Sequence, residues 1–177
     1  MSKKVALIVG GNGGIGSAIA GKMVGKAIKV YSSCYKKKNG EQHTLLNSLK
    51  MDVTDELSVH NALDKILKEQ KIDIVVFSAS AHVENKQLMM LKWDDFSKHL
   101  DVQIKGLLNI LHALKDQIKA KHKTKFIIIL TEYCIGKPPA ALSHYVSAKY
   151  ALMGLAKSMA VELAKYNCTV NMVSPGM

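Results

Sequence analysis

Two residues with complementary acid–base chemistry, Tyr145 and Lys149, lie four positions apart in the second half of the chain. Residues four apart share one face of a helix, so the phenol and the ammonium group would be neighbours. A nearby positive charge favours the phenolate, and we therefore expect the pKa of Tyr145 to fall from about 10 toward the working range of an enzyme. The alternative is a half-buried structural tyrosine beside a solvated lysine.

A glycine-rich segment near the N-terminus is the second candidate for chemistry: Val9-Gly10-Gly11-Asn12-Gly13-Gly14-Ile15-Gly16. It follows an apolar run and opens a stretch with helical spacing of apolar residues from Ile15 to Val24. Glycines let the backbone approach a pyrophosphate closely, and free N–H groups at a helix start favour negative charge. The segment predicts a phosphate-binding corner, although such a motif is weak evidence by itself and a plain glycine loop is the alternative.

Length and composition limit the classes of protein that fit. A chain of 177 residues with 48% apolar residues can form one domain with a sizeable core. Cys34, Cys134 and Cys168 lack metal-like spacing, and their odd number argues against a disulfide framework. The first apolar run has five residues, too few for a signal peptide or a membrane span. We expect a cytoplasmic protein without a metal site or membrane contact.

The formal net charge of +11 raises the question of nucleic acid binding. The lysines are spread along the chain, with local runs at 36–38 and 119–125. No known nucleic-acid-binding motif accompanies them, and aromatic residues make up 6% of the chain. We interpret the charge as a solvated lysine surface that attracts phosphorylated cofactors, and salt-sensitive binding of polyanions is the alternative.

Apolar runs and helical patterns alternate along the chain. Short apolar runs predict strands, and stripes of apolar residues at spacings of three and four predict helices. The expected strands lie within 5–9, 28–31, 45–53, 72–77, 126–130 and 169–173, and the expected helices within 15–24, 54–66, 94–114 and 148–163. This alternation predicts an α/β fold, a doubly wound parallel sheet of about six strands, as a single domain over residues 1–177.

Together these features resemble the short-chain dehydrogenase/reductase family, which includes 3-oxoacyl-carrier-protein reductases. The resemblance covers nearly the whole chain and rests on Gly10-x-x-x-Gly14-Ile15-Gly16, Asp52-Val53, Tyr145-x-x-x-Lys149, and Asn171 with Pro175-Gly176. It implies a Rossmann-type fold and hydride transfer between a nicotinamide cofactor and a carbonyl or alcohol substrate, small or acyl-carrier-bound. Family members continue beyond the Pro-Gly turn, so the resemblance also implies a chain that is truncated at its C-terminus.

The resemblance assigns roles to residues of this chain. Tyr145 would exchange a proton with the substrate oxygen, and Lys149 would also hold the nicotinamide ribose. Asp52 would hydrogen-bond the adenine amine beside Val53, and capping the helix that follows is an alternative role that is compatible with the first. The other residues expected to bind the cofactor are Gly10, Asn12, Gly13, Gly14, Ile15, Gly16, Tyr35, Lys36, Ser78, Ala79, Ser80, Pro175 and Gly176.

The end of the second expected strand bears on the choice of cofactor. A family member that prefers NAD places an acidic residue there, on the ribose hydroxyls. In this chain the position falls at Cys34, followed by Tyr35 and Lys36. Since no carboxylate is available and lysines could meet a 2′-phosphate, we expect NADP in preference to NAD. Gly13 argues the other way, because NADP-binding members often carry a basic residue at that position.

Several positions depart from the family pattern. The Asn-Asn-Ala-Gly segment reads Phe77-Ser78-Ala79-Ser80, so the serines would supply part of its hydrogen bonding. Gln103 replaces the asparagine that carries a water in the family's proton relay. The catalytic serine position falls at Glu132, with Thr131 beside it. A carboxylate facing the tyrosine would raise the tyrosine pKa, and a shift of one residue would present Thr131 instead.

Two functional hypotheses follow. The first is an NADP-dependent short-chain reductase or dehydrogenase with Tyr145 as general acid/base and Lys149 as its partner. The second is a catalytically weakened NADP(H)-binding protein that senses or scaffolds, because Glu132 and Gln103 depart from the pattern. The resemblance also implies a homodimer in which the helices of 94–116 and 145–165 pair across a two-fold axis. The alternative is that both helices only cover the sheet.

Overall fold

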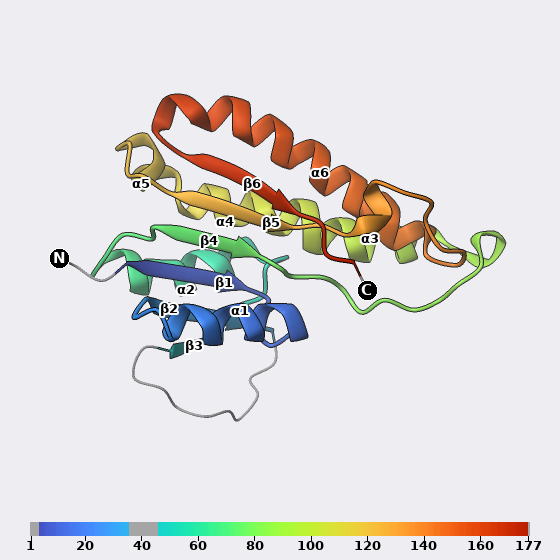
Figure 1. Ribbon diagram of the computed structural model, residues 1–177, viewed down its shortest axis with the longest axis horizontal. Coiled ribbons are helices and arrows are strands. Elements are labelled where there is room, and N and C mark those ends of the chain that lie inside the picture. The colour runs from blue at the N-terminus through green and yellow to red at the C-terminus, as the bar shows by residue number, and fades with distance from the viewer. Residues whose placement is uncertain (1–3, 36–45, 177) are drawn as a thin grey trace.

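The computed structural model describes residues 4–35 and 46–176 of the chain. Six parallel strands form one sheet in the order β3-β2-β1-β4-β5-β6 (Figure 1). The strands are β1 (Val5–Val9), β2 (Lys29–Cys34), β3 (Leu46–Lys50), β4 (Ile74–Phe77), β5 (Lys125–Ile129) and β6 (Thr169–Val173). The chain starts in the middle, builds outward to β3, and returns to place β4 beside β1. The predicted doubly wound parallel sheet is confirmed.

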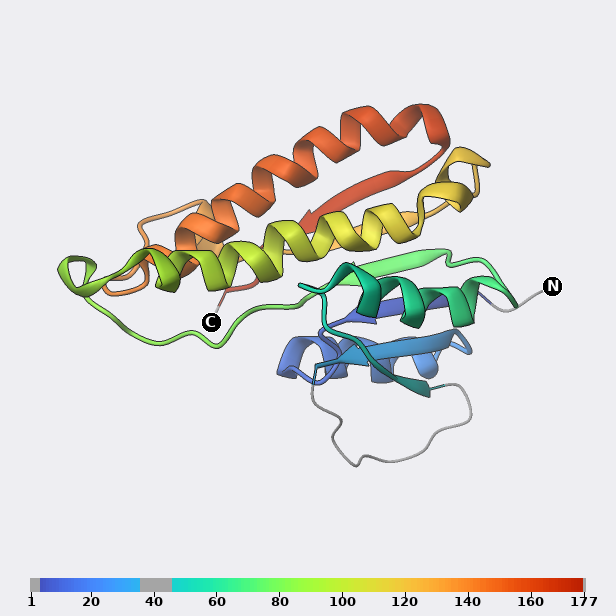
Figure 2. The ribbon, with the colours of Figure 1, turned by 180° about the vertical axis from the view of Figure 1, so that it is seen from behind.

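Helices cover both faces of this sheet. Figures 1 and 2 show α2, α4 and α6 on one face and α1 on the other. The helices are α1 (Gly14–Val24), α2 (Glu56–Leu67), α3 (Trp93–Leu100), α4 (Gly106–Ala113), α5 (Lys115–Lys119) and α6 (Ser143–Leu163), with 3₁₀ turns at Leu88–Met90, Glu132–Cys134 and Ala164–Tyr166. Helix α2 packs on α4, and α3 packs on α6. In the two described ranges no helix is both long and apolar enough to span a lipid bilayer.

The central strand β1 contributes to two hydrophobic clusters. Val5, Leu7 and Val9 belong to the cluster under α2, α4 and α6, whereas Ala6 and Ile8 belong to the cluster under α1. Each of these five side chains is at most 3% exposed. Successive residues of a strand point to opposite faces, so a strand covered on both sides must be apolar throughout. The continuous apolar run is therefore the sequence signature of this position in the sheet.

The structure differs from the sequence expectation within the span 94–114, where one continuous helix was expected. A π-helical turn, Asp101–Lys105, joins α3 to α4, and the Gly106 N–H donates to the Asp101 carbonyl. Helix α4 then begins in close contact with the loop between β3 and α2, since a Cβ on Gly106 would lie 2.9 Å from Val53 Cγ2. The Asn109 side chain donates a 2.8 Å hydrogen bond to the Val53 carbonyl. The apolar stripe does not reveal this turn, because apolar spacing continues through it while α4 covers the sheet and α3 packs on α6.

Gln117 on α5 connects buried backbone near β4 to the segment before β5. Its side-chain oxygen accepts a hydrogen bond from the Ile72 N–H at 3.1 Å. Its side-chain nitrogen donates to the Ile72 carbonyl at 2.9 Å and to the Thr124 hydroxyl at 2.8 Å. All three residues are buried. This amide therefore satisfies polar groups that water cannot reach.

We predict that Gln117→Leu lowers the free energy of unfolding by about 1–3 kcal/mol, because the buried Ile72 N–H loses its acceptor. Urea unfolding at pH 7 measures the loss. Gln87 is exposed and caps no helix with its side chain, so Gln87→Leu is the control, expected to change stability by less than about 0.5 kcal/mol. Equal losses in the two variants would contradict the prediction.

Candidate functional site

The glycine-rich turn packs against the segment that follows β4. Gly10 has a φ of +82°, and a Cβ on it would lie 2.7 Å from the Ala79 backbone nitrogen. The Ser78 hydroxyl donates a 2.8 Å hydrogen bond to the Val9 carbonyl, which links the ends of β1 and β4. A Cβ on Gly16 would collide with the Gly10 carbonyl oxygen. Glycine at both positions is therefore needed for the strand ends and the start of α1 to form one corner.

The start of α1 is open to an anion. Gly13 is the N-cap residue and offers no side-chain cap, and the first turn contains no acidic residue. A Cβ on Gly14 would have nothing within 4 Å, so this side of the turn faces open space. The N–H groups of a helix start that lack a side-chain acceptor favour a negatively charged ligand. The corner therefore fits a phosphate group.

A cavity of about 940 Å³ adjoins this corner at the carboxyl ends of the strands. Nine residues that are expected from the sequence to bind the cofactor line this cavity: Gly10, Asn12, Gly13, Tyr35, Asp52, Val53, Ser78, Ala79 and Ser80. Of the others, Gly14, Ile15 and Gly16 begin α1, while Pro175 and Gly176 follow β6. Lys36 lies outside the described residues. A cavity where the strand order reverses, here between β1 and β4, is the usual nucleotide-binding position of a doubly wound sheet.

Asp52 lines the cavity without capping α2. Its Oδ1 accepts hydrogen bonds from the Thr54 N–H at 2.9 Å and the Thr54 hydroxyl at 2.8 Å. The cap of α2 is Asp55, whose carboxylate accepts from the Leu57 N–H at 3.0 Å. The alternative capping role considered for Asp52 is thus wrong, and its loop holds the carboxylate at the cavity wall.

Tyr145 and Lys149 both lie on α6, but their pKa values shift differently from the sequence expectation. Lys149 is 3% exposed and donates a 2.8 Å hydrogen bond to the Ile129 carbonyl. Its Nζ lies 5.8 Å from the centre of the Tyr145 ring. Burial lowers the pKa of Lys149 to about 8. Burial also raises the pKa of Tyr145 above its ordinary value, so the expected lowering is wrong, because desolvation of the phenol outweighs the opposite effect of Thr131.

Thr131, rather than Glu132, brings its side chain to Tyr145. Thr131 is buried just after β5, where its hydroxyl accepts a 3.5 Å hydrogen bond from the Tyr133 N–H, and its interaction with the Tyr145 side chain opposes the rise of the tyrosine pKa. Glu132 is directed at the turn after β6. Its N–H donates to the Pro175 carbonyl at 3.0 Å, and a Cβ on Gly176 would lie 2.7 Å from its Oε2. Of the two residues considered for the serine position, Thr131 has the geometry of a hydroxyl partner for the phenol.

Gln103 lies in the π-helical turn with its side chain enclosed. It is 0% exposed, and neither its amide oxygen nor its amide nitrogen has a hydrogen-bond partner within the described ranges. Leaving both ends of a buried amide unpaired costs free energy. A water molecule, which both donates and accepts, is the ligand that such a group can hold.

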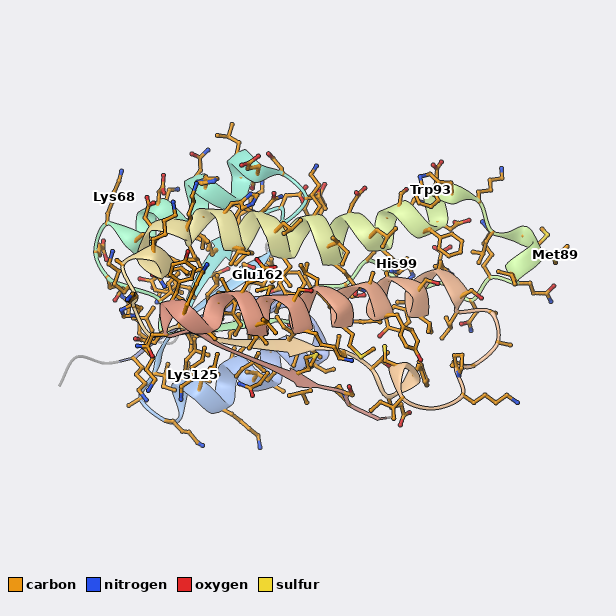
Figure 3. The ribbon with its side chains drawn as sticks, turned by 90° about the horizontal axis from the view of Figure 1, so that it is seen from above. Lys68, Met89, Trp93, His99, Lys125 and Glu162 are labelled. Carbon is orange, nitrogen blue, oxygen red and sulfur yellow. The ribbon has the colours of Figure 1, made fainter. Side chains whose placement is uncertain are left out.

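Two histidines that the sequence analysis did not single out also line the cavity. His99 on α3 and His144 on α6 are 2% and 4% exposed. Their ring centres are 4.9 Å apart, and the His99 ring centre is 6.0 Å from that of Tyr145. Figure 3 shows His99 between α3 and α6. His144 directly precedes Tyr145 in the sequence and could have been noticed there, but only the packing of α3 on α6 brings His99 to the site.

The buried ammonium of Lys149 predicts a pH dependence of stability. Its folded pKa is about 8 and its unfolded pKa is near 10.4, so the unfolded state binds more protons between these values. The free energy of unfolding should therefore rise from about pH 8 to pH 10, by up to about 3 kcal/mol relative to Lys149→Met. Urea unfolding at several pH values tests this. Lys157→Met, which removes an exposed lysine of the same helix, should keep the wild-type profile, and parallel profiles of wild type and Lys149→Met would refute the prediction.

Comparison with known proteins adds evidence of relationship. A sequence profile described as short chain dehydrogenase matches residues 4–177. The 3-oxoacyl-[acyl-carrier-protein] reductase FabG of Salmonella typhimurium is 31% identical over 180 residues, which cover 98% of this chain and 72% of the relative. FabG of Escherichia coli is 30% identical over 181 residues with the same coverage. Tropinone reductase-like 3 of Erythroxylum coca is 29% identical over 184 residues, covering 98% of this chain and 69% of that protein.

Solved structures support the same relationship. ElxO with NADP bound superposes with a TM-score of 0.89 and 27% identity, covering 99% of this chain and 74% of that one. The 4-hydroxyisoleucine dehydrogenase complexed with NADH has a TM-score of 0.86 and 27% identity, covering 99% of this chain and 76% of that one. Both neighbours carry a nicotinamide cofactor. This chain therefore belongs to the short chain dehydrogenase family of NAD(P)-dependent oxidoreductases.

Proposed function

We propose that the protein catalyses the NADP(H)-dependent reduction of a carbonyl compound, or the reverse oxidation of the alcohol. The observation that carries this proposal is the contact between the Thr131 and Tyr145 side chains, beside His99 of the cavity wall. Two hydroxyl groups in contact form a donor pair for one substrate oxygen. A bound nicotinamide would supply the hydride in reduction and accept it in oxidation.

The residues of the cavity fit a phosphorylated dinucleotide. The uncapped start of α1 at Gly13 and Gly14 would hold the pyrophosphate through backbone N–H groups. Asp52 and Val53 would border the adenine. A volume of about 940 Å³ suits a ligand of this size. Cys34 and Tyr35 line the wall at the end of β2, where a carboxylate for the ribose hydroxyls would otherwise lie.

The side chains around Tyr145 would divide the proton chemistry. Burial keeps the phenol protonated at neutral pH, so its hydroxyl can donate a proton to the carbonyl oxygen during reduction. The Thr131 hydroxyl would donate a hydrogen bond to the same oxygen as negative charge builds there. Lys149, held on the Ile129 carbonyl, would stabilise the phenolate that remains. Gln103 would hold a water through which the proton is replaced.

A catalytically weakened cofactor-binding protein is the second candidate. It is favoured by the raised pKa of Tyr145 and by the hydrogen bond that holds Lys149 on the Ile129 carbonyl. For either candidate we propose a homodimer through the helices of 94–116 and 145–165, where α6 exposes the apolar surfaces of Tyr150 and Val161. NADPH binding with only background reduction of a broad panel of carbonyl compounds would select this second candidate.

We predict that Thr131→Val lowers kcat for carbonyl reduction by about 10²–10³, because a donor to the substrate oxygen is lost. Tyr145→Phe should lower kcat by about 10²–10⁴ through loss of the proton donor. Glu132→Gln removes a charge at nearly constant shape and should change kcat by less than about threefold, since that side chain lies against Gly176. NADPH oxidation is the assay, and fluorescence titration should give the same NADPH affinity in all three variants. A larger loss in Glu132→Gln than in Thr131→Val would assign the serine position to Glu132.

We predict that NADPH binds at least several-fold more tightly than NADH, because Cys34 leaves the ribose end of the cavity without a carboxylate. Cys34→Asp should reverse the preference, and fluorescence titration with both cofactors measures it. Gly14→Val should abolish binding of both, since its side chain would enter the space above the helix start. Gly21→Val is the matched control, because a Cβ on this glycine of α1 also has nothing within 4 Å. Equal affinities in the wild type would refute the proposed preference.

A further inference from the structure

The cavity wall contains a pair of buried imidazoles that the proposed reaction does not use. His99 and His144 meet edge to face, with an angle of 62° between their rings. Nδ1 of each ring is enclosed and has no hydrogen-bond partner among the residues described. Because Nδ1 is enclosed, Nε2 is the nitrogen of each ring that a bound molecule could reach. Buried polar groups of a folded protein are nearly always paired, so this pair requires an explanation.

The neighbours of the pair are mostly unable to act as its partners. The Phe96 ring meets the edge of His144 at 6.5 Å between centres, and Trp93 stacks on Phe96 at 6.4 Å. On the other side the Tyr145 ring meets His99. The two imidazoles therefore form the polar centre of an aromatic row that runs from Trp93 to Tyr145. Both residues also line the cavity, so a molecule bound there can reach the pair from that side.

Whether an imidazole is charged or neutral determines which ligand groups can hydrogen-bond to it. Burial, together with the charges of His144, Lys149 and Lys98, lowers the pKa of His99 to about 4, against an opposite effect of Asp95. The His99 ring is therefore neutral at pH 7. A neutral imidazole has one N–H donor and one acceptor nitrogen, whereas a carboxylate can only accept. A hydroxyl group, which donates and accepts, is the better match.

We propose that His99 and His144 bind a hydroxyl group of the substrate and so select hydroxy ketones over plain ketones. This inference rests on the proposed function, because it names the substrate class of the same site. The hydroxyl site lies within a few bonds of the reacting carbonyl, since the His99 and Tyr145 ring centres are 6.0 Å apart. A site built around such hydrogen bonds rejects an analogue that lacks the hydroxyl, because the imidazole nitrogens that face the ligand are then left unpaired.

Two ketones of nearly equal shape provide the test: 1-hydroxybutan-2-one and pentan-3-one, which differ by a hydroxyl in place of a methyl group. We expect kcat/KM with NADPH to favour the hydroxy ketone by about 10²-fold or more. His99→Leu and His144→Leu should bring the ratio close to one, mainly by slowing the hydroxy ketone. His144→Gln keeps a donor and an acceptor and should retain part of the preference. His112→Leu, an exposed position on α4, should keep the full ratio.

A second measurement separates this inference from the proposed function. The full chain is labelled with ¹⁵N-histidine and saturated with NADP⁺, and each ketone is added while the imidazole signals are recorded. Shifts of His99 and His144 with the hydroxy ketone alone support the inference even if turnover is absent, which would leave only the proposed function refuted. Equal turnover of both ketones would support the proposed function and overturn the inference. Unshifted imidazole signals with both ketones would also overturn it.

Discussion

The close approach of Gly10 to the backbone of Ala79 is the constraint on which the site depends. The two residues lie at the ends of adjacent central strands, and a Cβ at the first would come within 2.7 Å of the second. The left-handed φ of Gly10 turns the chain at once into α1. Because this turn is so tight, the helix begins beside the strand ends, and its N-cap residue Gly13 lines the same cavity as Ser78, Ala79 and Asp52. The glycine-rich corner and the cavity wall beside it therefore both depend on the tight turn at Gly10.

Burial governs the chemistry of the other half of the site. The pKa values of Lys149 and His99 are lowered and that of Tyr145 is raised, so each of the three groups moves toward its neutral form. A site of low polarity strengthens the remaining dipoles, because less water screens them. Hydroxyl groups in such an environment are better donors to a developing negative charge than the same groups would be at the surface. The side-chain amide of Gln103 is enclosed as well.

Much of the fold could be predicted from the sequence, because a strand that is buried on both faces of the sheet consists of apolar residues throughout. The apolar runs located the central strands β1, β4 and β5, which are largely buried, and the glycine spacing indicated the corner at Gly10 and Gly16. The pKa of Tyr145 could not be predicted, because its sign depends on how deeply α6 packs. Neither could the surroundings of Thr131 and Glu132, because the 3₁₀ turn after β5 leaves Thr131 buried, whereas Glu132 is exposed and lies against Gly176.

Other features depend on contacts between segments far apart in the sequence. The π-helical turn Asp101–Lys105 keeps the apolar stripe intact, so periodicity alone cannot distinguish it from a regular helix. The pairing of His99 with His144 exists only because α3 packs on α6. A lone histidine on an otherwise apolar helix face gives no sign of such a partner. These parts of the site depend on tertiary packing, which the local sequence pattern does not show.

The order of the strands also has a consequence for folding. The sheet consists of two halves, β3-β2-β1 and β4-β5-β6, and β1 and β4 are the pair of strands that joins them. This pairing brings together residues as distant in sequence as Ala6 and Ile74, so its loop-closure entropy must be overcome before the contact gains stability. Residues of both halves form the wall of the cavity, so the cavity exists only after the two halves have packed together. Ligand binding is therefore coupled to the docked state, and a bound cofactor would slow separation of the halves as well as stabilise the native protein.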